Sequence, residues 1–220
     1  MTRPIVAHVI AVASHGRYLV REALETGSTP LLVGFHGYME TADTQMERLA
    51  HIPGADRWVL VSIQGLNRFY HRQAEQVVAN WMTRQDREVA ITDNNAYVSA
   101  VVETVRMQLG ATGPLVFAGF SQGVAMTFRA ACASTLHVAG VVALGGDVPP
   151  ELDRNALALV RNALMGRGER DGWYTAEKRA ADVARLRDAQ VNLEAPVLDA
   201  AHEWTADFSR TVGVFLDRLA

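Results

Sequence analysis

Short apolar runs alternate along this chain with segments in which apolar residues recur at helical spacing. Parallel strands buried on both faces read as continuous apolar runs, and helices usually connect them. The alternation therefore predicts an α/β fold with a mostly parallel central sheet and helices on both faces. We expect strands at Leu31–Phe35, 58–63, 115–120, 138–144, within 159–165 and at 191–198, and helices at about 41–51, 93–109, 122–134, 175–189 and 205–219.

The beginning of the chain is expected to add an antiparallel hairpin to the leading edge of this sheet. Residues 5–13 and 17–24 flank the turn-like residues Ser14, His15 and Gly16. His8 interrupts the first apolar stretch, and neither a basic cluster nor a clear small-residue cleavage site accompanies it, so we interpret it as a strand rather than an export signal. An edge strand can pair with a second copy or stay free, so a monomer and a homodimer both fit.

Residues 64–92 have only a partial helical period, and we expect a loop with short helical turns there. Long irregular connections in compact domains are often binding loops. Its Phe69, Tyr70, Trp81 and Met82 are candidate substrate-binding residues, although packing onto the sheet explains them equally well. The following helix is expected to begin after Asp93 as its N-cap.

Composition narrows the class of protein. A chain of 220 residues, 49% of them apolar, is long enough for one core, and we expect one domain over residues 1–220 with no large cap domain. The net charge of −3 and the absence of a basic patch argue against a nucleic-acid partner. No apolar run is long enough to span a membrane. Cys132 is the single cysteine, so no internal disulfide can form, and we interpret it as a buried thiol. A reducing, cytoplasmic location fits this best.

The most informative motif is Gly-Phe-Ser-Gln-Gly at residues 119–123, between an expected strand and an expected helix. A strand that turns sharply into a helix holds its middle residue in a strained conformation, and only small neighbours leave room for that turn. Gly119 and Gly123 supply the room, which makes Ser121 a candidate nucleophile. A helix-capping serine in an ordinary tight turn is the alternative.

A catalytic serine needs a base and an acid that orients the base. Loops after parallel strands gather at one edge of the sheet, so these partners should follow later strands. His202 follows the last expected strand and is the candidate base. Asp171 follows the preceding strand and is the candidate acid, with Asp147, Glu169 and Asp199 as alternatives. The chain order Ser, Asp, His is the one expected for the α/β-hydrolase arrangement.

Charge on a tetrahedral intermediate needs backbone N–H donors aimed at it. The amide of Gln122 is one candidate, because N–H groups at the start of a helix lack partners within the helix. The second should come from the loop after the early strand, where His36, Gly37 and Tyr38 lie, and Tyr38 is our choice. An ordinary strand-ending turn explains this His-Gly pair equally well.

With these pieces the chain resembles the α/β-hydrolase superfamily, and within it the small carboxylesterase and phospholipase-like branch that also contains acyl-protein thioesterases. The resemblance covers nearly the whole chain and rests on FHGY at 35–38, GFSQG at 119–123, the GRGERD segment ending at Asp171 and AHEW at 201–204. It implies that Ser121 is the nucleophile, Asp171 the acid and His202 the base, and that the amides of Tyr38 and Gln122 form the oxyanion hole.

Three departures limit what the resemblance implies. Tyr174 replaces the valine that often follows the acid in this family, and Met39 and Glu40 stand where acyl-protein thioesterases often have Gly-Asp, which puts protein deacylation in doubt. The segment from Asn80 to Met82 is similar to esterases of the feruloyl or polyhydroxybutyrate-depolymerase type, but without an export signal an extracellular polymer is a poor candidate substrate.

The sequence therefore predicts a serine hydrolase that needs no metal or cofactor and cleaves small-molecule carboxylic esters or thioesters of small to medium acyl groups. Transfer of the acyl group to peroxide or an alcohol by the same three residues remains an alternative. So does a ligand-binding protein that has kept the fold without catalysis.

Overall fold

The computed structural model describes residues 3–24, 28–71 and 75–220. Its main sheet has the strand order β1-β3-β2-β6-β7-β8-β10, and β9 also pairs with β8. Every pairing in this sheet is parallel except that of β1 with β3. The strands are β1 (Tyr18–Arg21), β2 (Leu31–Phe35), β3 (Val59–Ile63), β6 (Leu115–Phe120), β7 (Val138–Leu144), β8 (Asn162–Gly168), β9 (Asn192–Glu194) and β10 (Val197–Leu198).

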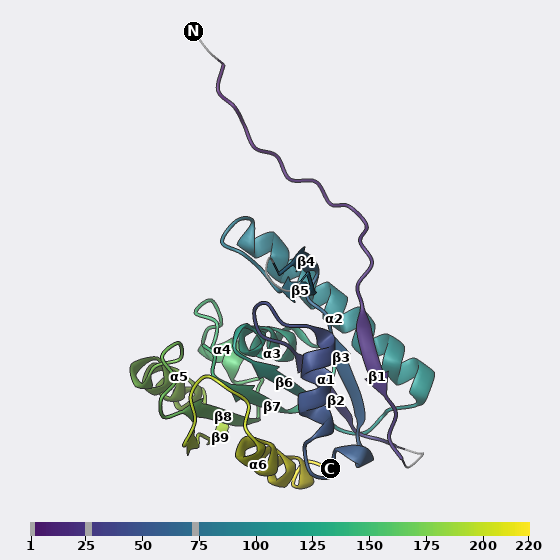
Figure 1. Ribbon diagram of the computed structural model, residues 1–220, viewed down its shortest axis with the longest axis vertical. Coiled ribbons are helices and arrows are strands. Elements are labelled where there is room, and N and C mark those ends of the chain that lie inside the picture. Colours follow the sequence, from purple (N-terminus) through teal and green to yellow (C-terminus); the bar gives the residue numbers. More distant parts are fainter. Residues whose placement is uncertain (1–2, 25–27, 72–74) are drawn as a thin grey trace.

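Helices cover both faces of the sheet (Figure 1), and each face has its own apolar core. Alternate residues of one strand serve the two cores: Val33 of β2 belongs to one and its neighbour Leu32 to the other. On the first face lie α2 (Arg87–Leu109), α3 (Gln122–Ala133), the short α4 (Arg154–Leu157) and α5 (Ala176–Asp188). On the second lie α1 (Ala42–Ala50), the 3₁₀ turn η1 (Ala55–Arg57) and α6 (Ala206–Asp217). The predicted fold class is confirmed.

The last expected strand, residues 191–198, is divided into β9 and β10. Both pieces pair with β8 in one register, Asn162 with Asn192 and Arg167 with Val197. Pro196 lies between them and has no N–H to donate to a ladder. The proline therefore interrupts the pairing without shifting it.

The leading edge differs from the expected hairpin. An antiparallel strand is present there, but β1 pairs with β3, and residues 5–13 are exposed chain without strand pairing. In Figure 1 this segment extends away from the body of the protein. Contacts at its root account for the difference, because the Arg17 carbonyl accepts hydrogen bonds from the Tyr97 hydroxyl and the Gln64 amide.

Residues 64–92 contain a second, two-stranded sheet rather than short helical turns. Strands β4 (Asn67–Tyr70) and β5 (Val77–Asn80) pair antiparallel, and the connecting residues 72–74 lie outside the described part of the chain. Helix α2 begins at Arg87, so the expected N-cap at Asp93 is wrong and Asp93 lies inside the helix. An ion pair of Arg87 with Glu151 (2.8 Å) stabilises the added first turns.

Cys132 is half-buried beside the first core, and its thiol donates to the Ala156 carbonyl. Burial, assisted by nearby Asp153, raises the pKa of this thiol to about 11. The helices of the described residues include none that combines the length and apolar character needed to cross a bilayer.

Candidate functional site

Ser121 occupies a strained turn between β6 and α3. Its φ of 53° and ψ of −120° lie where residues other than glycine are uncommon. A side chain at Gly123 is excluded, since a Cβ there would lie 2.1 Å from the Phe35 carbonyl oxygen. The Ser121 amide donates to the Leu144 carbonyl of β7 (2.9 Å). The turn expected from the sequence is thus present, wedged between neighbouring strand ends.

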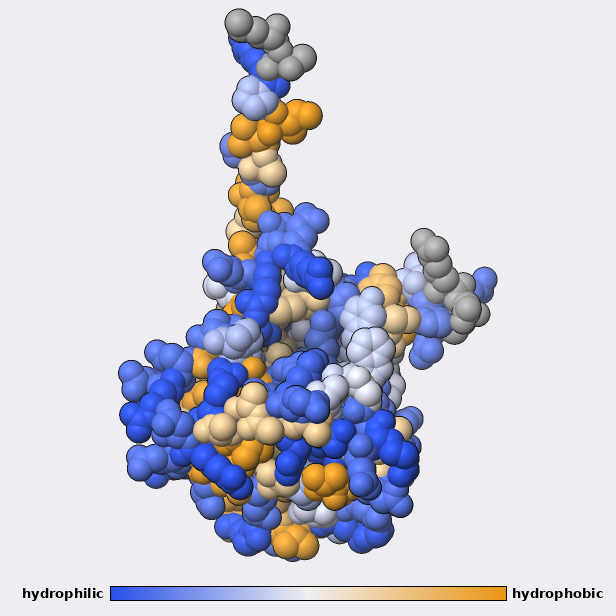
Figure 2. Space-filling view, turned by 90° about the vertical axis from the view of Figure 1, so that its left-hand side faces the viewer, coloured by the Kyte–Doolittle hydropathy of each residue, from blue (hydrophilic) through white to orange (hydrophobic). Residues whose placement is uncertain are grey.

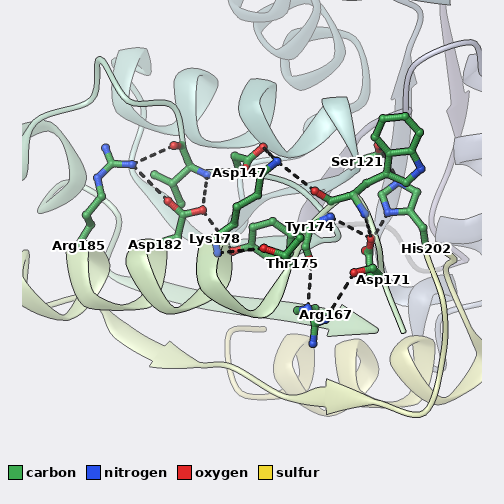
Figure 3. Close-up of polar contacts among 12 residues, drawn as sticks. Ser121, Asp147, Arg167, Asp171, Tyr174, Thr175, Lys178, Asp182, Arg185 and His202 are labelled. Carbon is green, nitrogen blue, oxygen red and sulfur yellow. Dashed lines mark hydrogen bonds and ion pairs between the residues drawn. The ribbon is translucent and has the colours of Figure 1, made fainter. Parts of the chain in front are cut away.

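His202 connects Ser121 to Asp171 (Figure 3). Its Nε2 lies 2.9 Å from Ser121 Oγ, and its Nδ1 lies 2.8 Å from Asp171 Oδ2. An ionised carboxylate only accepts, so the proton of a neutral imidazole belongs on Nδ1 and Nε2 is left to accept from the serine hydroxyl. Gly145 and the Phe120 ring border the imidazole, the ring centroid at 5.0 Å. The three expected side chains therefore form one hydrogen-bonded row.

Asp171 is held as a carboxylate although its side chain is only 1% exposed. Burial by itself would raise its pKa, but the Tyr174 amide, His202 and the Trp173 amide together bring that pKa below its ordinary value. Both amides donate to Oδ1, at 2.9 and 2.8 Å, which leaves Oδ2 for the imidazole. Buried Arg167 holds the same loop through three backbone carbonyls, those of Glu169, Asp171 and Tyr174. Figure 3 shows Arg167 beside this loop.

The other candidate carboxylates have different partners. Asp147 is 3.5 Å from Lys178 and exposed, and Asp199 forms an exposed ion pair with Arg170. Glu169 contributes backbone contacts to the loop. Asp171 is the carboxylate in contact with His202.

The loop after β2 begins beside the Ser121 turn, because Phe35 pairs with Gly119 in the neighbouring strand β6. The backbone amides of Tyr38 and Gln122 have no acceptor within the residues that the structure describes. The Tyr38 ring is 54% exposed and lies 6.1 Å from that of Phe69 on β4. Two uncommitted N–H donors are therefore available on neighbouring loops.

Buried His36 supports the first of these loops. Its Nε2 accepts from the Gly65 amide (2.9 Å), so its proton is on Nδ1, which donates to the Gly37 carbonyl (2.7 Å). Burial is the main cause of a lowered His36 pKa. The indole N–H of Trp81 donates to the His36 carbonyl (2.8 Å). This histidine is a structural support of the loop.

An ion pair that sequence reasoning did not identify also holds this loop. Both terminal guanidinium nitrogens of Arg48 donate to Glu40 at 2.6 Å, and Glu40 Oε2 accepts from the Gly37 amide at 2.7 Å. The guanidinium lies over the Phe120 ring, 4.3 Å from its centroid. The sequence marks Glu40 only as a departure from the thioesterase pattern. Its eight-residue separation from Arg48 crosses a loop–helix boundary and fits no local spacing rule.

The Gln122 side chain ties the Ser121 turn to the second sheet. Its Oε1 accepts from the Trp81 amide (3.0 Å), and its Nε2 donates to the Met82 carbonyl (3.2 Å). The loop after β2 is tied to that sheet as well, because the Ala79 amide donates to the Glu40 carbonyl (3.0 Å) and the Met39 amide donates to the Ala79 carbonyl (3.0 Å). The hairpin β4–β5 is thus fastened to both loops of the site.

The four candidate substrate-binding residues occupy different environments. Trp81 is fully buried beneath the loop after β2, where it packs edge-on against Phe35. Met82 is half-buried, and its sulfur accepts from Arg129. Phe69 is half-buried next to Tyr38, and Tyr70 is 72% exposed. Their part in substrate binding stays a prediction. Within the described ranges no group of His, Cys, Asp and Glu side chains is arranged to hold a metal ion.

The Glu40–Arg48 pair gives a test of what holds the site loop. Burial alone would raise the pKa of Glu40, but Arg48 and the Gly37 amide lower it below its ordinary 4.5. A carboxyl group whose pKa is lower in the folded state stabilises the fold at any pH above its pKa in the unfolded state. That contribution is lost as the pH falls through its pKa in the folded state. We therefore expect Glu40→Gln to reduce the free energy of unfolding by about 1–3 kcal/mol at pH 7, and the loss to shrink in acid.

Urea unfolding at pH 7 and at acid pH measures this difference. Asp43→Asn is the matched control, because Asp43 pairs with Arg17 on the surface with 60% of its side chain exposed. Exposed pairs contribute about 0–1 kcal/mol. A Glu40→Gln loss that is independent of pH, or no larger than that of Asp43→Asn, would contradict the supporting role.

Comparison with known proteins places this geometry in a family. Residues 23–215 match the model of the phospholipase/carboxylesterase family. Similar solved structures include a Mesorhizobium loti carboxylesterase, with a TM-score of 0.74 and 18% sequence identity over 92% of this chain and 94% of that one. Another is Zea mays acyl-protein thioesterase 2, with a TM-score of 0.73 and 15% identity over 93% of this chain and 99% of that one. A Bacillus cereus carboxylesterase is also similar, with a TM-score of 0.72 and 15% identity over 93% of this chain and 95% of that one. At these identities the likeness establishes the fold.

A search of curated protein sequences found no match. The family model covers far more than half of the chain and includes Ser121, Asp171 and His202. This chain belongs to the phospholipase/carboxylesterase family of α/β-hydrolases.

Proposed function

We propose that this protein is a serine esterase that cleaves carboxylic esters or thioesters of small to medium acyl groups through an acyl-enzyme. The observation that carries the proposal is the hydrogen-bonded row of Ser121, His202 and Asp171 at the carboxyl edge of the sheet. Family membership supports a hydrolase with an esterase-like site. The uncommitted amides of Tyr38 and Gln122 supply the remaining requirement.

In the first half of the reaction, Ser121 Oγ attacks the carbonyl carbon while His202 Nε2 takes the hydroxyl proton. The imidazolium that forms is stabilised by Asp171, whose lowered pKa keeps it ionised. Negative charge on the carbonyl oxygen is stabilised by the Tyr38 and Gln122 amides, the second of which begins a helix. His202 then protonates the departing alcohol or thiol, and the acyl group remains on Ser121.

In the second half, His202 takes a proton from water, and the resulting hydroxide attacks the acyl carbon. Collapse of the second tetrahedral intermediate breaks the bond to Ser121 Oγ, which regains its proton from His202. The carboxylic acid leaves, and the row of three side chains returns to its starting state. No metal or redox step enters this sequence.

The surroundings of the site favour an apolar substrate group. The Tyr38 and Phe69 rings lie side by side, and Met39 and Tyr70 are exposed nearby in sequence. Glu40, which replaces the residue that acyl-protein thioesterases often carry, is bound to Arg48 and the Gly37 amide, so its carboxylate is occupied. Small-molecule esters are therefore the substrate class we propose, ahead of acylated proteins.

Removal of the nucleophile tests the proposal. Ser121→Ala is expected to lower turnover of p-nitrophenyl acyl esters by a factor on the order of 10⁴ or more, because no other group can form the acyl-enzyme. Ser99→Ala, at a half-buried serine of α2, is the control and should retain the activity of the parent. Equal turnover by Ser121→Ala and the parent protein would sink the assignment.

Replacement of the acid tests the orientation of the base. In Asp171→Asn the amide oxygen can still accept from Trp173 and Tyr174, but the NH₂ group then faces His202 Nδ1 and imposes the wrong tautomer. We expect kcat to fall by roughly 10⁴ with little change in the melting temperature. Asp147→Asn, at the competing carboxylate, should keep near-parental kcat. The reverse pattern in the two variants would assign the acid to Asp147.

A further inference from the structure

An apolar arm near the start of the chain, residues 3–17, plays no part in the proposed reaction. Residues 3–17 form no helix or strand, and the five large aliphatic side chains among them are each at least 62% exposed. Figure 2 shows these hydrophobic residues standing clear of the body. They are Ile5, Val6, Val9, Ile10 and Val12. Exposed apolar surface of this extent marks an interaction site.

The arm has the sequence of a buried strand. In an extended segment alternate residues face opposite ways, so Ile5 and Val9 share one face with the alanines at 7, 11 and 13. Val6, Ile10 and Val12 share the other, and both faces are therefore apolar. Only His8 is polar between residues 5 and 13. A strand that is apolar on both faces requires cover on both, together with a neighbouring strand for its backbone N–H and C=O groups.

An unused strand edge lies next to the root of the arm. Among the residues that the structure describes, strand β1 is the terminal strand of the main sheet and pairs on one side only, with β3. Its Val20 is 41% exposed, and Leu24 just beyond it is 80% exposed. A free edge with apolar side chains is a template for pairing with another strand.

Contacts at the root of the arm disfavour a hairpin in which the arm pairs with β1 of the same chain. A tight hairpin with a two-residue turn at His15–Gly16 would need the Arg17 carbonyl to accept from the Ser14 amide of the arm. That oxygen already accepts from the Tyr97 hydroxyl at 2.8 Å and the Gln64 amide at 2.9 Å, which uses both lone pairs. The backbone at Gly16 also lies against the Tyr97 ring, where a Cβ would be 2.1 Å from a ring carbon.

The body of the same chain leaves the arm without cover as well. A groove of about 750 Å³ lies between arm residues 9–14 and helix α2, with Val89 and Ala90 on its helix side. Within the described part of the chain this stretch of the arm has no strand partner, and the groove separates it from α2.

We propose that the occupant is a second copy of this chain, in a two-fold dimer in which the arm of each copy adds antiparallel to the β1 edge of the other. The exchange pairs the two segments that the hydrophobic pattern predicts as partners, but between chains rather than within one. Such exchange of an identical element is a common route to dimers. Its symmetry also uses both free edges, so the assembly closes at two copies.

Light scattering of the purified protein after size exclusion tests the stoichiometry. The parent chain is expected to be a dimer, and the double variant Val9→Asp, Ile10→Asp a folded monomer with unchanged esterase activity per chain, because a charge on each face of the arm prevents its burial. Met107→Asp, at an exposed apolar residue near the end of α2, is the matched control and should remain dimeric. A monomeric parent chain, or a dimer that survives the double variant, overturns the proposal.

Cysteine pairing separates exchange from a hairpin within one chain. A two-residue turn at His15–Gly16 would set Ala11 opposite Val20, and the exchanged arm reproduces that pairing between copies. We therefore expect Ala11→Cys with Val20→Cys, in a Cys132→Ala background, to give covalent dimers on mild oxidation. Each single cysteine variant is the control and should stay mostly monomeric on a non-reducing gel. Oxidation that yields only internally cross-linked monomer, or no cross-link at all, contradicts exchange.

Discussion

Neighbouring strands of the main sheet pair in parallel, and this pairing determines where the site residues lie. Because β2, β6, β7 and β8 run in the same direction, the loops that follow them emerge at one edge of the sheet. Ser121 follows β6, Gly145 follows β7, and Asp171 lies in the loop after β8. The adjacency of β2 to β6 brings the start of the loop that contains Tyr38 next to the Ser121 turn. Residues far apart in the sequence thereby meet without any rearrangement of the core.

Side chains that hold backbone groups then fix the loops at that edge. Arg167 holds the loop of Asp171, His36 and Glu40 hold the loop of Tyr38, and the Gln122 side chain holds the segment after β5. The strained serine turn lies against the end of β2, where the Gly123 backbone approaches Phe35 so closely that a side chain at residue 123 has no room. Pre-organisation of this kind places donors and acceptors before substrate arrives, which is how electrostatic stabilisation contributes to a rate.

The sequence predicted the features that depend on local pattern. Apolar runs located β2, β6 and β7, and the Gly-Phe-Ser-Gln-Gly motif located the turn of Ser121. Chain order and placement after the later strands selected His202, and favoured Asp171 over Asp147, Glu169 and Asp199; the structure joins Asp171 and His202 by a hydrogen bond. Features set by tertiary contacts were missed. Hydrogen bonds from Tyr97 and Gln64 to the Arg17 carbonyl keep the root of the arm from forming a hairpin. The ion pair of Arg87 with Glu151 stabilises the added first turns of α2, and the ion pair of Glu40 with Arg48 joins a loop to a helix.

Covalent labelling shows whether Ser121 is activated by the side chains that are hydrogen-bonded to it. The folded protein is treated with a fluorophosphonate, its intact mass is measured, and the modified peptide is sequenced by mass spectrometry. We expect one adduct per chain, located on Ser121, and labelling that is strongly slowed in His202→Ala. An adduct on another residue, or no adduct on protein shown to be folded by circular dichroism, would contradict it.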